Sequence, residues 1–301
     1  MNITYPLLLD GGLSNELESQ GHDLNHKLWS AKLLASNPEA IVLAHLVYLE
    51  SGAQCIITSS YQATVAGFIT LGYDEIAAKS LLLKSVQAAE EARTRFMTAH
   101  PNNVKPYIAA SIGPYGAYLA DGSEYRGDYT VSDKELKDFH RSRIDVLDNS
   151  NADFFACETI PSFREAAILS EILNTTKKQA WVSFSCKDDQ HINDGTPIEK
   201  CAALFAHHPN VFAVGVNCTA PKYISGLIKA IKTKAGNKKI VVYPNSGEVY
   251  HAESKTWSGF SDPTVCELMT TEWLHLGADI IGGCCRMGPE HIKAMSNIIL
   301  H

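Results

Sequence analysis

The chain has 301 residues, a length that fits one large domain or two small ones. With 45% hydrophobic and 20% charged residues, its composition is that of a globular protein and excludes a disordered or fibrous chain. The 26 lysines and arginines stand against 33 aspartates and glutamates, a formal net charge of −7 without a basic cluster, which argues against a nucleic-acid partner.

Nothing in the sequence predicts a membrane segment or export. The apolar runs fall short of the roughly 18 residues that a membrane span needs. The N-terminal residues lack the basic and apolar regions of a signal peptide. We therefore expect a cytoplasmic protein without membrane partners, whose eight cysteines are reduced.

Eight short apolar segments follow one another along the chain, and each is predicted to be a strand. Their continuous apolar character is typical of parallel strands that are buried on both faces. In chain order they are 7–10, 54–58, 107–111, 153–157, 180–186, 211–218, 239–243 and 279–284.

Helical patterns lie between these strands, and several of their starts are marked. Two capping boxes, Ser132-x-x-Glu135 and Ser162-x-x-Glu165, predict helix N-termini. Prolines, which the first turn of a helix tolerates, stand at five further predicted starts: Pro38, Pro197, Pro221, Pro263 and Pro289.

A strand followed by a helix, eight times over, is the order of a (β/α)8 barrel, whose typical length is about 250 residues. The competing layout is a doubly wound open sheet, but no Gly-x-Gly-x-x-Gly follows the first strand to support it. No linker divides the chain. We therefore expect one barrel domain over residues 1–301.

Three of the eight cysteines stand at the ends of the sixth and eighth strands: Cys218, Cys284 and Cys285. In a closed barrel only the seventh strand separates these two, so the three thiols can converge on one metal ion. Three thiolates with one open position are a plausible catalytic zinc shell. Gly282 and Gly283 are expected to let the chain change course before the pair. The alternative is that these cysteines are packing residues, the role expected of the other five.

Several motifs at the predicted strand ends occur together in one known family. The short ones are Asp10-Gly11-Gly12, Glu158-Thr159, Gly215-Val216-Asn217-Cys218 and Gly282-Gly283-Cys284-Cys285-Arg286. With them the chain resembles the zinc-dependent homocysteine S-methyltransferases. Residues 58–64 and 113–127 are similar to the branch of that family that uses S-methylmethionine or S-adenosylmethionine as methyl donor. The resemblance covers essentially the whole chain.

The resemblance implies a barrel in which Cys218, Cys284 and Cys285 hold Zn²⁺, with the homocysteine sulfur as fourth ligand. It also implies that Glu158 binds the homocysteine amino group.

It further implies that the backbone amides of Gly11 and Gly12 bind the homocysteine carboxylate, and that Asn217 belongs to the substrate site. In betaine-using relatives a tyrosine follows the corresponding glutamate. Here that residue is Thr159, so a tyrosine contact to zinc is not expected.

Methyl transfer to sulfur suits these residue types. The thiolate is the nucleophile, and a free thiol is mostly protonated near neutral pH. Zn²⁺ removes that proton without a dedicated base, and three anionic cysteines keep the attacking sulfur electron-rich. The donor is a sulfonium whose leaving group is a neutral thioether. We therefore expect no catalytic acid or base beyond the zinc-activated substrate thiolate.

The segment after the third predicted strand is rich in tyrosines and acidic residues, which suits a cationic donor. Tyr115, Tyr118 and Glu124 are the predicted donor contacts. An aromatic face stabilises a desolvated cation by about 0.5–2 kcal/mol. The alternative is a loop whose tyrosines pack on one another.

The function predicted from these features is homocysteine S-methyltransferase, making methionine, with S-methylmethionine favoured over S-adenosylmethionine as donor. One alternative is a methyltransferase for selenocysteine or another thiol on the same fold. Another is a non-catalytic zinc or thiol sensor, whose metal would be indifferent to homocysteine.

Overall fold

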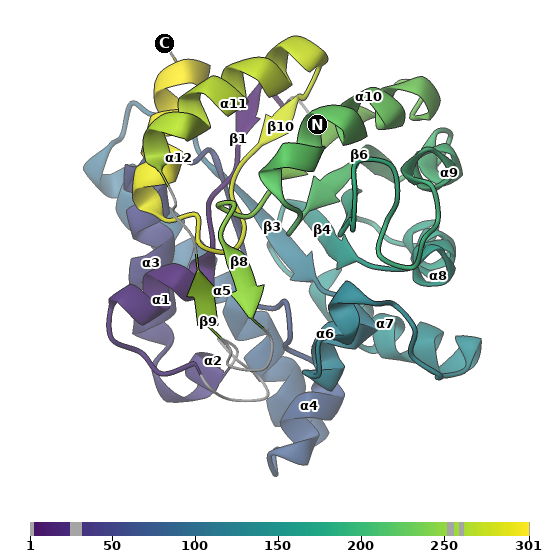
Figure 1. Ribbon diagram of the computed structural model, residues 1–301. Helices are drawn as coiled ribbons and strands as arrows, with labels where there is room; N and C mark the ends of the chain where they lie inside the picture. The colour runs from purple at the N-terminus through teal and green to yellow at the C-terminus, as the bar shows by residue number, and fades with distance from the viewer. Residues whose placement is uncertain (1–2, 25–31, 252–255, 259–261, 301) are drawn as a thin grey trace.

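Eight parallel strands form a nearly closed barrel in the computed structural model, which describes residues 3–24, 32–251, 256–258 and 262–300 (Figure 1). Their order around the sheet is β1-β10-β7-β6-β5-β4-β3-β2. A parallel bridge between Leu9 and Cys55 and a hydrogen bond from the Asp10 N–H to the Cys55 carbonyl (3.0 Å) join β1 to β2. The predicted (β/α)8 barrel is confirmed.

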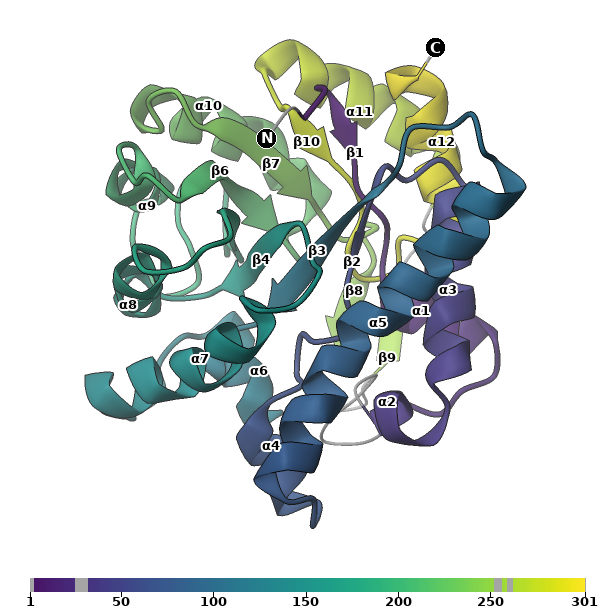
Figure 2. The same ribbon diagram turned by 180° about the vertical axis from the view of Figure 1, so that it is seen from behind.

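The barrel strands match the eight predicted segments, and most are shorter than expected. Their bounds are β1 (Leu7–Leu8), β2 (Cys55–Ile57), β3 (Tyr107–Ile112), β4 (Phe154–Ile160), β5 (Ala180–Phe184), β6 (Val211–Asn217), β7 (Lys239–Tyr243) and β10 (Ile280–Ile281). A hairpin in the loop after β7, β8 (Val249–His251) with β9 (Thr256–Ser258), was not predicted. It lies at the same end of the barrel as α6 (Tyr115–Leu119) (Figure 2).

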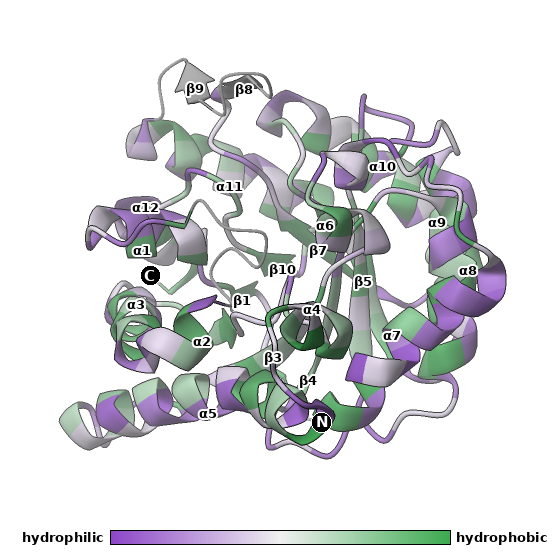
Figure 3. Cartoon of the chain, turned by 90° about the horizontal axis from the view of Figure 1, so that it is seen from below, coloured by the Kyte–Doolittle hydropathy of each residue, from purple (hydrophilic) through white to green (hydrophobic). Residues whose placement is uncertain are grey.

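Helices surround the barrel and turn their hydrophilic residues outward (Figure 3). Besides α6 they are α1 (Leu13–Ser19), α2 (Leu33–Ser36), α3 (Pro38–Glu50), α4 (Val65–Thr70), α5 (Glu75–Ala99), α7 (Asp133–Leu147), α8 (Phe163–Leu173), α9 (Ile198–Phe205), α10 (Ile224–Lys234), α11 (Pro263–Leu276) and α12 (Pro289–Ile299). No helix in the described part of the chain is long and apolar enough to cross a membrane.

Apolar side chains form two cores, one between the strands and the helices and one inside the barrel. Phe154, Trp181 and Tyr243 fill much of the barrel interior, as large side chains do in this fold. The five cysteines outside the predicted site are all buried free thiols, in agreement with a packing role: Cys55, Cys157, Cys186, Cys201 and Cys266.

Three of the predicted helix starts differ in detail in the structure, and one of them is Pro221, which opens a 3₁₀ turn, Pro221–Tyr223, ahead of α10. Ser132 and Glu135 form the predicted capping box at the start of α7. At α8, Ser162 accepts a hydrogen bond from the Glu165 N–H (3.2 Å), but the Glu165 side chain binds other groups, so the box is incomplete. Pro197 is the residue before α9 rather than its first residue.

His45 lies in α3, fully buried, and neither ring nitrogen has a hydrogen-bond partner among the described residues. Burial lowers its pKa to about 4, so the fold holds a neutral imidazole. Below the unfolded pKa of about 6.5, the unfolded chain alone gains a proton, which costs about 1.4 kcal/mol of stability per pH unit until pH 4.

We expect His45→Leu to lessen acid destabilisation. Between pH 7 and pH 5 the wild-type protein should lose about 2 kcal/mol more unfolding free energy than the variant. Urea unfolding at both pH values measures this difference. His207→Leu, which removes an exposed histidine, is the control. Equal losses in wild type and His45→Leu would contradict the prediction.

Candidate active site

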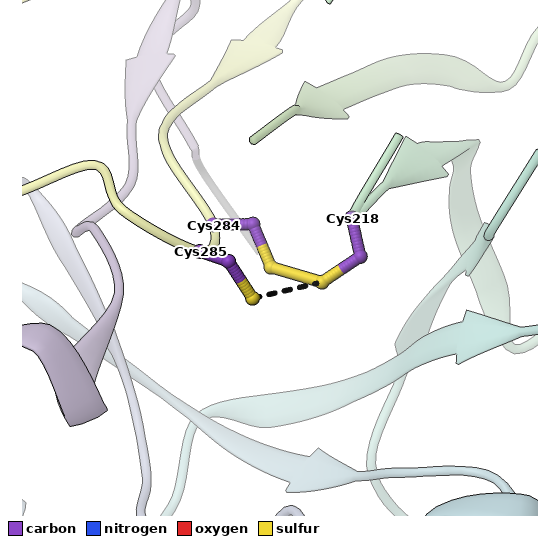
Figure 4. Close-up of side chains that lie close together, drawn as sticks. All are labelled: Cys218, Cys284 and Cys285. Atoms are coloured by element: carbon purple, nitrogen blue, oxygen red, sulfur yellow. Dashed lines mark hydrogen bonds between the residues drawn. A yellow bond between two sulfur atoms is a disulfide. The ribbon is translucent and has the colours of Figure 1, made fainter. Parts of the chain in front are cut away.

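Three thiol groups meet where β6 and β10 end. The sulfur atoms of Cys218, Cys284 and Cys285 all lie within 4.8 Å of one another. Cys218 and Cys284 are joined by a disulfide, in contrast to the expectation that all eight cysteines are reduced, and the Cys285 sulfur lies 3.9 Å from that of Cys218 (Figure 4). The predicted convergence of the sixth and eighth strand ends is therefore present, with only β7 between them.

The backbone turns sharply at Cys218, not at the glycines before the pair. Cys218 has a φ of 46°, a left-handed conformation that redirects the chain directly after β6. Gly282 and Gly283 do not have positive φ, which corrects the expected role of these glycines. A Cβ on Gly282 would lie 2.9 Å from the Asp10 carbonyl, so the glycine lets two strand ends approach closely.

The loop after β1 packs directly against the loop that carries the two adjacent cysteines. A Cβ on Gly12 would lie 2.7 Å from the Cys284 carbonyl, and one on Gly11 would lie 2.8 Å from the Tyr48 ring. The Gly12 N–H already donates to the Met287 carbonyl (2.9 Å). Within the described part of the chain the Gly11 N–H has no partner. Of the two amides predicted to bind a carboxylate, the one at Gly11 is therefore available.

Two buried carboxyl groups stand beside this cluster. Glu158, in β4, accepts hydrogen bonds from Ser111 and Tyr243. Burial raises its pKa to about 7, although these two hydrogen bonds act to lower it. Asp10 accepts the Ile57 N–H at one oxygen (2.8 Å), while its other oxygen is buried and has no partner among the described residues. Burial, together with the charge of Glu158, raises the pKa of Asp10 well above its usual range. Sequence reasoning placed Asp10 in a motif but gave it no role.

Asn217 is fully buried, and its side chain is bound by protein groups. Its amide oxygen accepts from the Thr159 N–H (2.6 Å) and the Ser183 hydroxyl (2.8 Å). Its amide nitrogen donates to the Thr159 hydroxyl (2.7 Å) and lies 3.9 Å from the Cys284 sulfur. Thr159 has a φ of 61°, which strains a β-branched residue. Asn217 therefore supports the turn after Glu158, and its assignment to the substrate site stays a prediction.

We expect Asn217→Ala to lower the unfolding free energy by roughly 2–4 kcal/mol, because it opens a cavity and leaves the Thr159 N–H unpaired. Metal affinity should fall roughly 10- to 100-fold, as for other groups behind a ligand. Urea unfolding and metal titration measure the two effects. Asn149→Ala, at an exposed position, is the control. If Asn217→Ala had the same stability and metal affinity as this control, the supporting role of Asn217 would be contradicted.

Several buried polar atoms that have no partner in the described part of the chain lie at the carboxyl ends of the strands. Such atoms are rare in folded proteins and indicate a place for a ligand or water. Those in the loops after β1, β2, β3 and β7 are Asp10 Oδ1, Ser59 Oγ, Gln62 Oε1, Glu124 Oε2 and Asn245 Oδ1. Sequence reasoning gave no role to Ser59, Gln62 or Asn245. Ser59 and Gln62 belong to the 58–64 motif, and the only signal for Asn245 was its position at a strand end.

The predicted donor residues separate into two groups. The rings of Tyr115 and Tyr118 pack on Phe139, with centroids 4.9 Å and 5.5 Å away, as in the alternative of mutually packed aromatic residues. Glu124 is half-buried and has an unpartnered oxygen. Tyr125, which was not selected, hydrogen-bonds to Cys285. Glu124 and Tyr125 are therefore the residues of this segment that interact with the thiol cluster: Tyr125 by a hydrogen bond to Cys285 and Glu124 through its charge.

The cluster fits a zinc ion. Cysteine sulfur is a preferred zinc ligand, and three protein ligands leave a fourth position for substrate. Burial raises the pKa of the Cys285 thiol to about 11, so this group remains protonated near neutral pH unless a cation stabilises the thiolate. Metal binding requires all three cysteines as thiols, and thus reduction of the disulfide between Cys218 and Cys284.

A (β/α)8 barrel whose strand ends carry a cluster of three cysteines able to bind a metal, beside buried carboxyl groups, is built as an enzyme. The family model for homocysteine S-methyltransferase matches residues 7–299. The chain belongs to this family of transferases, which confirms the resemblance found in its motifs.

Relatives match the chain over nearly its full length. It is 48% identical to homocysteine S-methyltransferase YbgG of Bacillus subtilis over 97% of the chain and 94% of that protein. It is 45% identical to homocysteine S-methyltransferase of Escherichia coli over 96% and 94%. Among solved structures, the metallated form of the homocysteine methyltransferase MmuM from Escherichia coli has a TM-score of 0.87 at 43% identity, covering 97% of this chain and 95% of that one. Its oxidized form has a TM-score of 0.88 with the same identity and coverage.

Proposed function

We propose that this protein transfers a methyl group from S-methylmethionine to the sulfur of homocysteine and releases methionine, with S-adenosylmethionine as a weaker donor. The observation that carries the proposal is the thiol cluster on neighbouring strand ends, beside the buried carboxyl groups of Asp10 and Glu158. Family membership supports the same acceptor.

Cys218, Cys284 and Cys285 would hold the zinc ion. When bound, Zn²⁺ lowers the pKa of a coordinated thiol and so supplies the acceptor sulfur as a thiolate at neutral pH. Asn217 and the left-handed backbone at Cys218 keep two of the three cysteines in place.

The acceptor amino acid is recognised by the groups around the first and fourth strands. Glu158 and the unpartnered oxygen of Asp10 bind the homocysteine ammonium, because a buried carboxylate is stabilised by a cation. The Gly11 N–H binds the acceptor carboxylate. These contacts hold the sulfur in place for the attack.

The methyl donor lies on the side of Glu124 and Tyr125. A bond forms between the acceptor sulfur and the methyl carbon, while the bond from that carbon to the donor sulfonium breaks and its electron pair stays on the departing sulfur. The leaving group is a neutral thioether, so no residue has to protonate it. Glu124 favours the cationic donor over this neutral product. The rings of Tyr115 and Tyr118 pack on each other and support the segment that carries Glu124.

The deciding experiment is a methyl-transfer assay with homocysteine and each of S-methylmethionine, S-adenosylmethionine and betaine, with and without a chelator. We expect activity with the two sulfonium donors, highest with S-methylmethionine, and its loss after chelation. The same assay with selenocysteine as acceptor, at equal donor concentration, tests the alternative of a methyltransferase for selenocysteine or another thiol. Tight zinc binding without methyl transfer to any acceptor would overturn the proposal in favour of a thiol sensor.

We also propose the cytoplasm as the compartment. The site needs three free thiols, and a reducing compartment keeps cysteines in this state.

A further inference from the structure

The segment that carries Glu124 and Tyr125 leaves the barrel after β3 and returns before α7. We call residues 115–129 the donor segment. It contains α6 and a short 3₁₀ turn, Ser123–Tyr125, and its two ends lie at Tyr115 and Tyr129. A connecting segment such as this one can position a ligand-binding side chain only if its two ends are fixed to the rest of the fold.

Both ends bind one buried carboxylate, that of Glu165 in α8. The Tyr115 N–H donates to Glu165 Oε1 (2.7 Å), and the Tyr129 hydroxyl donates to Glu165 Oε2. Glu165 is fully buried. This is the side chain that the sequence assigned to a capping box with Ser162, and the structure turns it to the donor segment instead.

Two further buried side chains orient this carboxylate. Arg143 donates to His140 Nδ1 (2.9 Å), and arginine has no acceptor atom, so Nδ1 must be the accepting nitrogen. The proton of the neutral ring is then on Nε2, which donates to Glu165 Oε1 (2.7 Å). Burial lowers the pKa of His140, consistent with a neutral ring. Arg143 also donates to the Gly113 carbonyl, two residues before the donor segment.

Inside the donor segment, rigid backbone packing connects the held end to Glu124. A Cβ on Gly116 would lie 2.6 Å from the Ser123 carbonyl carbon and 2.9 Å from the Glu124 Cα, so α6 rests directly on the 3₁₀ turn. The Gln62 side chain donates to the Ala117 carbonyl (2.8 Å) and fixes α6 to the loop after β2. A shift at Tyr115 is therefore passed to Glu124.

We propose that Glu165 is a positioning residue for the methyl donor: by holding both ends of the donor segment, it sets the place of Glu124 without contacting either substrate. The inference rests on the proposed donor contact of Glu124. It separates donor recognition from acceptor recognition, because in the described part of the chain Glu158 and Asp10 make no hydrogen bond to Glu165 or to the donor segment.

The test is Glu165→Gln, assayed with S-methylmethionine and homocysteine. The amide keeps the size of the side chain but offers one acceptor oxygen in place of two. We expect the KM for S-methylmethionine to rise roughly tenfold, because a misplaced contact group weakens binding. The KM for homocysteine and the zinc content should stay within about twofold of wild type. Increased hydrogen exchange at the donor segment should accompany the change.

Glu135→Gln is the matched control, since Glu135 has the corresponding place at the start of α7, and the side-chain hydrogen bonds that it makes among the described residues go to Ser132 and not to the donor segment. It should leave both KM values unchanged. Tyr129→Phe removes a single hydroxyl and should raise the donor KM alone, by a smaller factor. If Glu165→Gln fails to fold, Tyr129→Phe tests the proposal instead, and an unchanged donor KM in this variant would overturn the positioning role.

Glu124→Gln distinguishes the two levels of the proposal. If it leaves the donor KM unchanged, the donor site is wrong. If it raises the donor KM while Glu165→Gln and Tyr129→Phe do not, the donor site stands and the positioning role is overturned. Equal rises in both KM values for Glu165→Gln would mean a general structural defect and would also overturn it.

Discussion

Replacing Cys218 with serine is expected to abolish zinc binding and methyl transfer together. A serine hydroxyl is a much poorer zinc ligand than a thiolate. Loss of a direct ligand should exceed the roughly 10- to 100-fold cost of altering a group behind one, so we expect metal affinity to fall by more than about 100-fold. The zinc content of the purified, reduced protein and the homocysteine-dependent turnover are the measurements.

Cys284→Ser and Cys285→Ser should behave in the same way, because all three sulfurs belong to one cluster. Cys266→Ser is the matched control: it also removes a buried thiol, but one in α11 that is outside the cluster. Stoichiometric zinc and unchanged turnover in all three site variants would exclude these cysteines as ligands.

Replacing Glu158 with glutamine should weaken homocysteine binding while zinc remains bound. A hydrogen bond to a charged group contributes about 1.5–3 kcal/mol, which corresponds to a rise in the homocysteine KM of roughly 10- to 150-fold. The donor KM should be little affected. Glu171→Gln, at an exposed glutamate in α8, is the control. A homocysteine KM equal to that of the control would remove Glu158 from the site.

The ionisation of Glu158 predicts how homocysteine binding by the wild type depends on pH. Burial raises the pKa of this carboxyl to about 7, so in the free protein it gains its charge as the pH rises through that value. Only the charged form attracts an ammonium group strongly. The homocysteine KM of the wild type should therefore fall between pH 6 and pH 8, and the part of this fall due to Glu158 should be missing in Glu158→Gln. The same slope in both proteins would contradict the assignment.

Local sequence patterns predicted the barrel because each strand and helix has a recognisable pattern in its own residues. Continuous apolar runs identified all eight strands, and proline and serine marked many helix starts. The cysteines of the site were also found, because parallel strands align their carboxyl ends at one face. Their position in the chain thus implied their position in space.

Other features depend on contacts between residues far apart in the chain. The Gly12 amide is used by Met287, and the Asn217 side chain by Thr159 and Ser183, although each looked available in the sequence. Positive φ at Cys218 and Thr159 has no local signal, since neither residue type favours it.

The partners of Glu165 differ most clearly from those that its local sequence predicts. The pattern Ser-x-x-Glu is the same at Ser132 and at Ser162, and the sequence predicts one local use for both glutamates. The first is exposed and binds its own helix end, while the second is buried and accepts from Tyr115, Tyr129 and His140. Helix periodicity and strand order are properties of neighbouring residues. The partner of a buried polar group is decided by which distant segments the closed barrel brings against it.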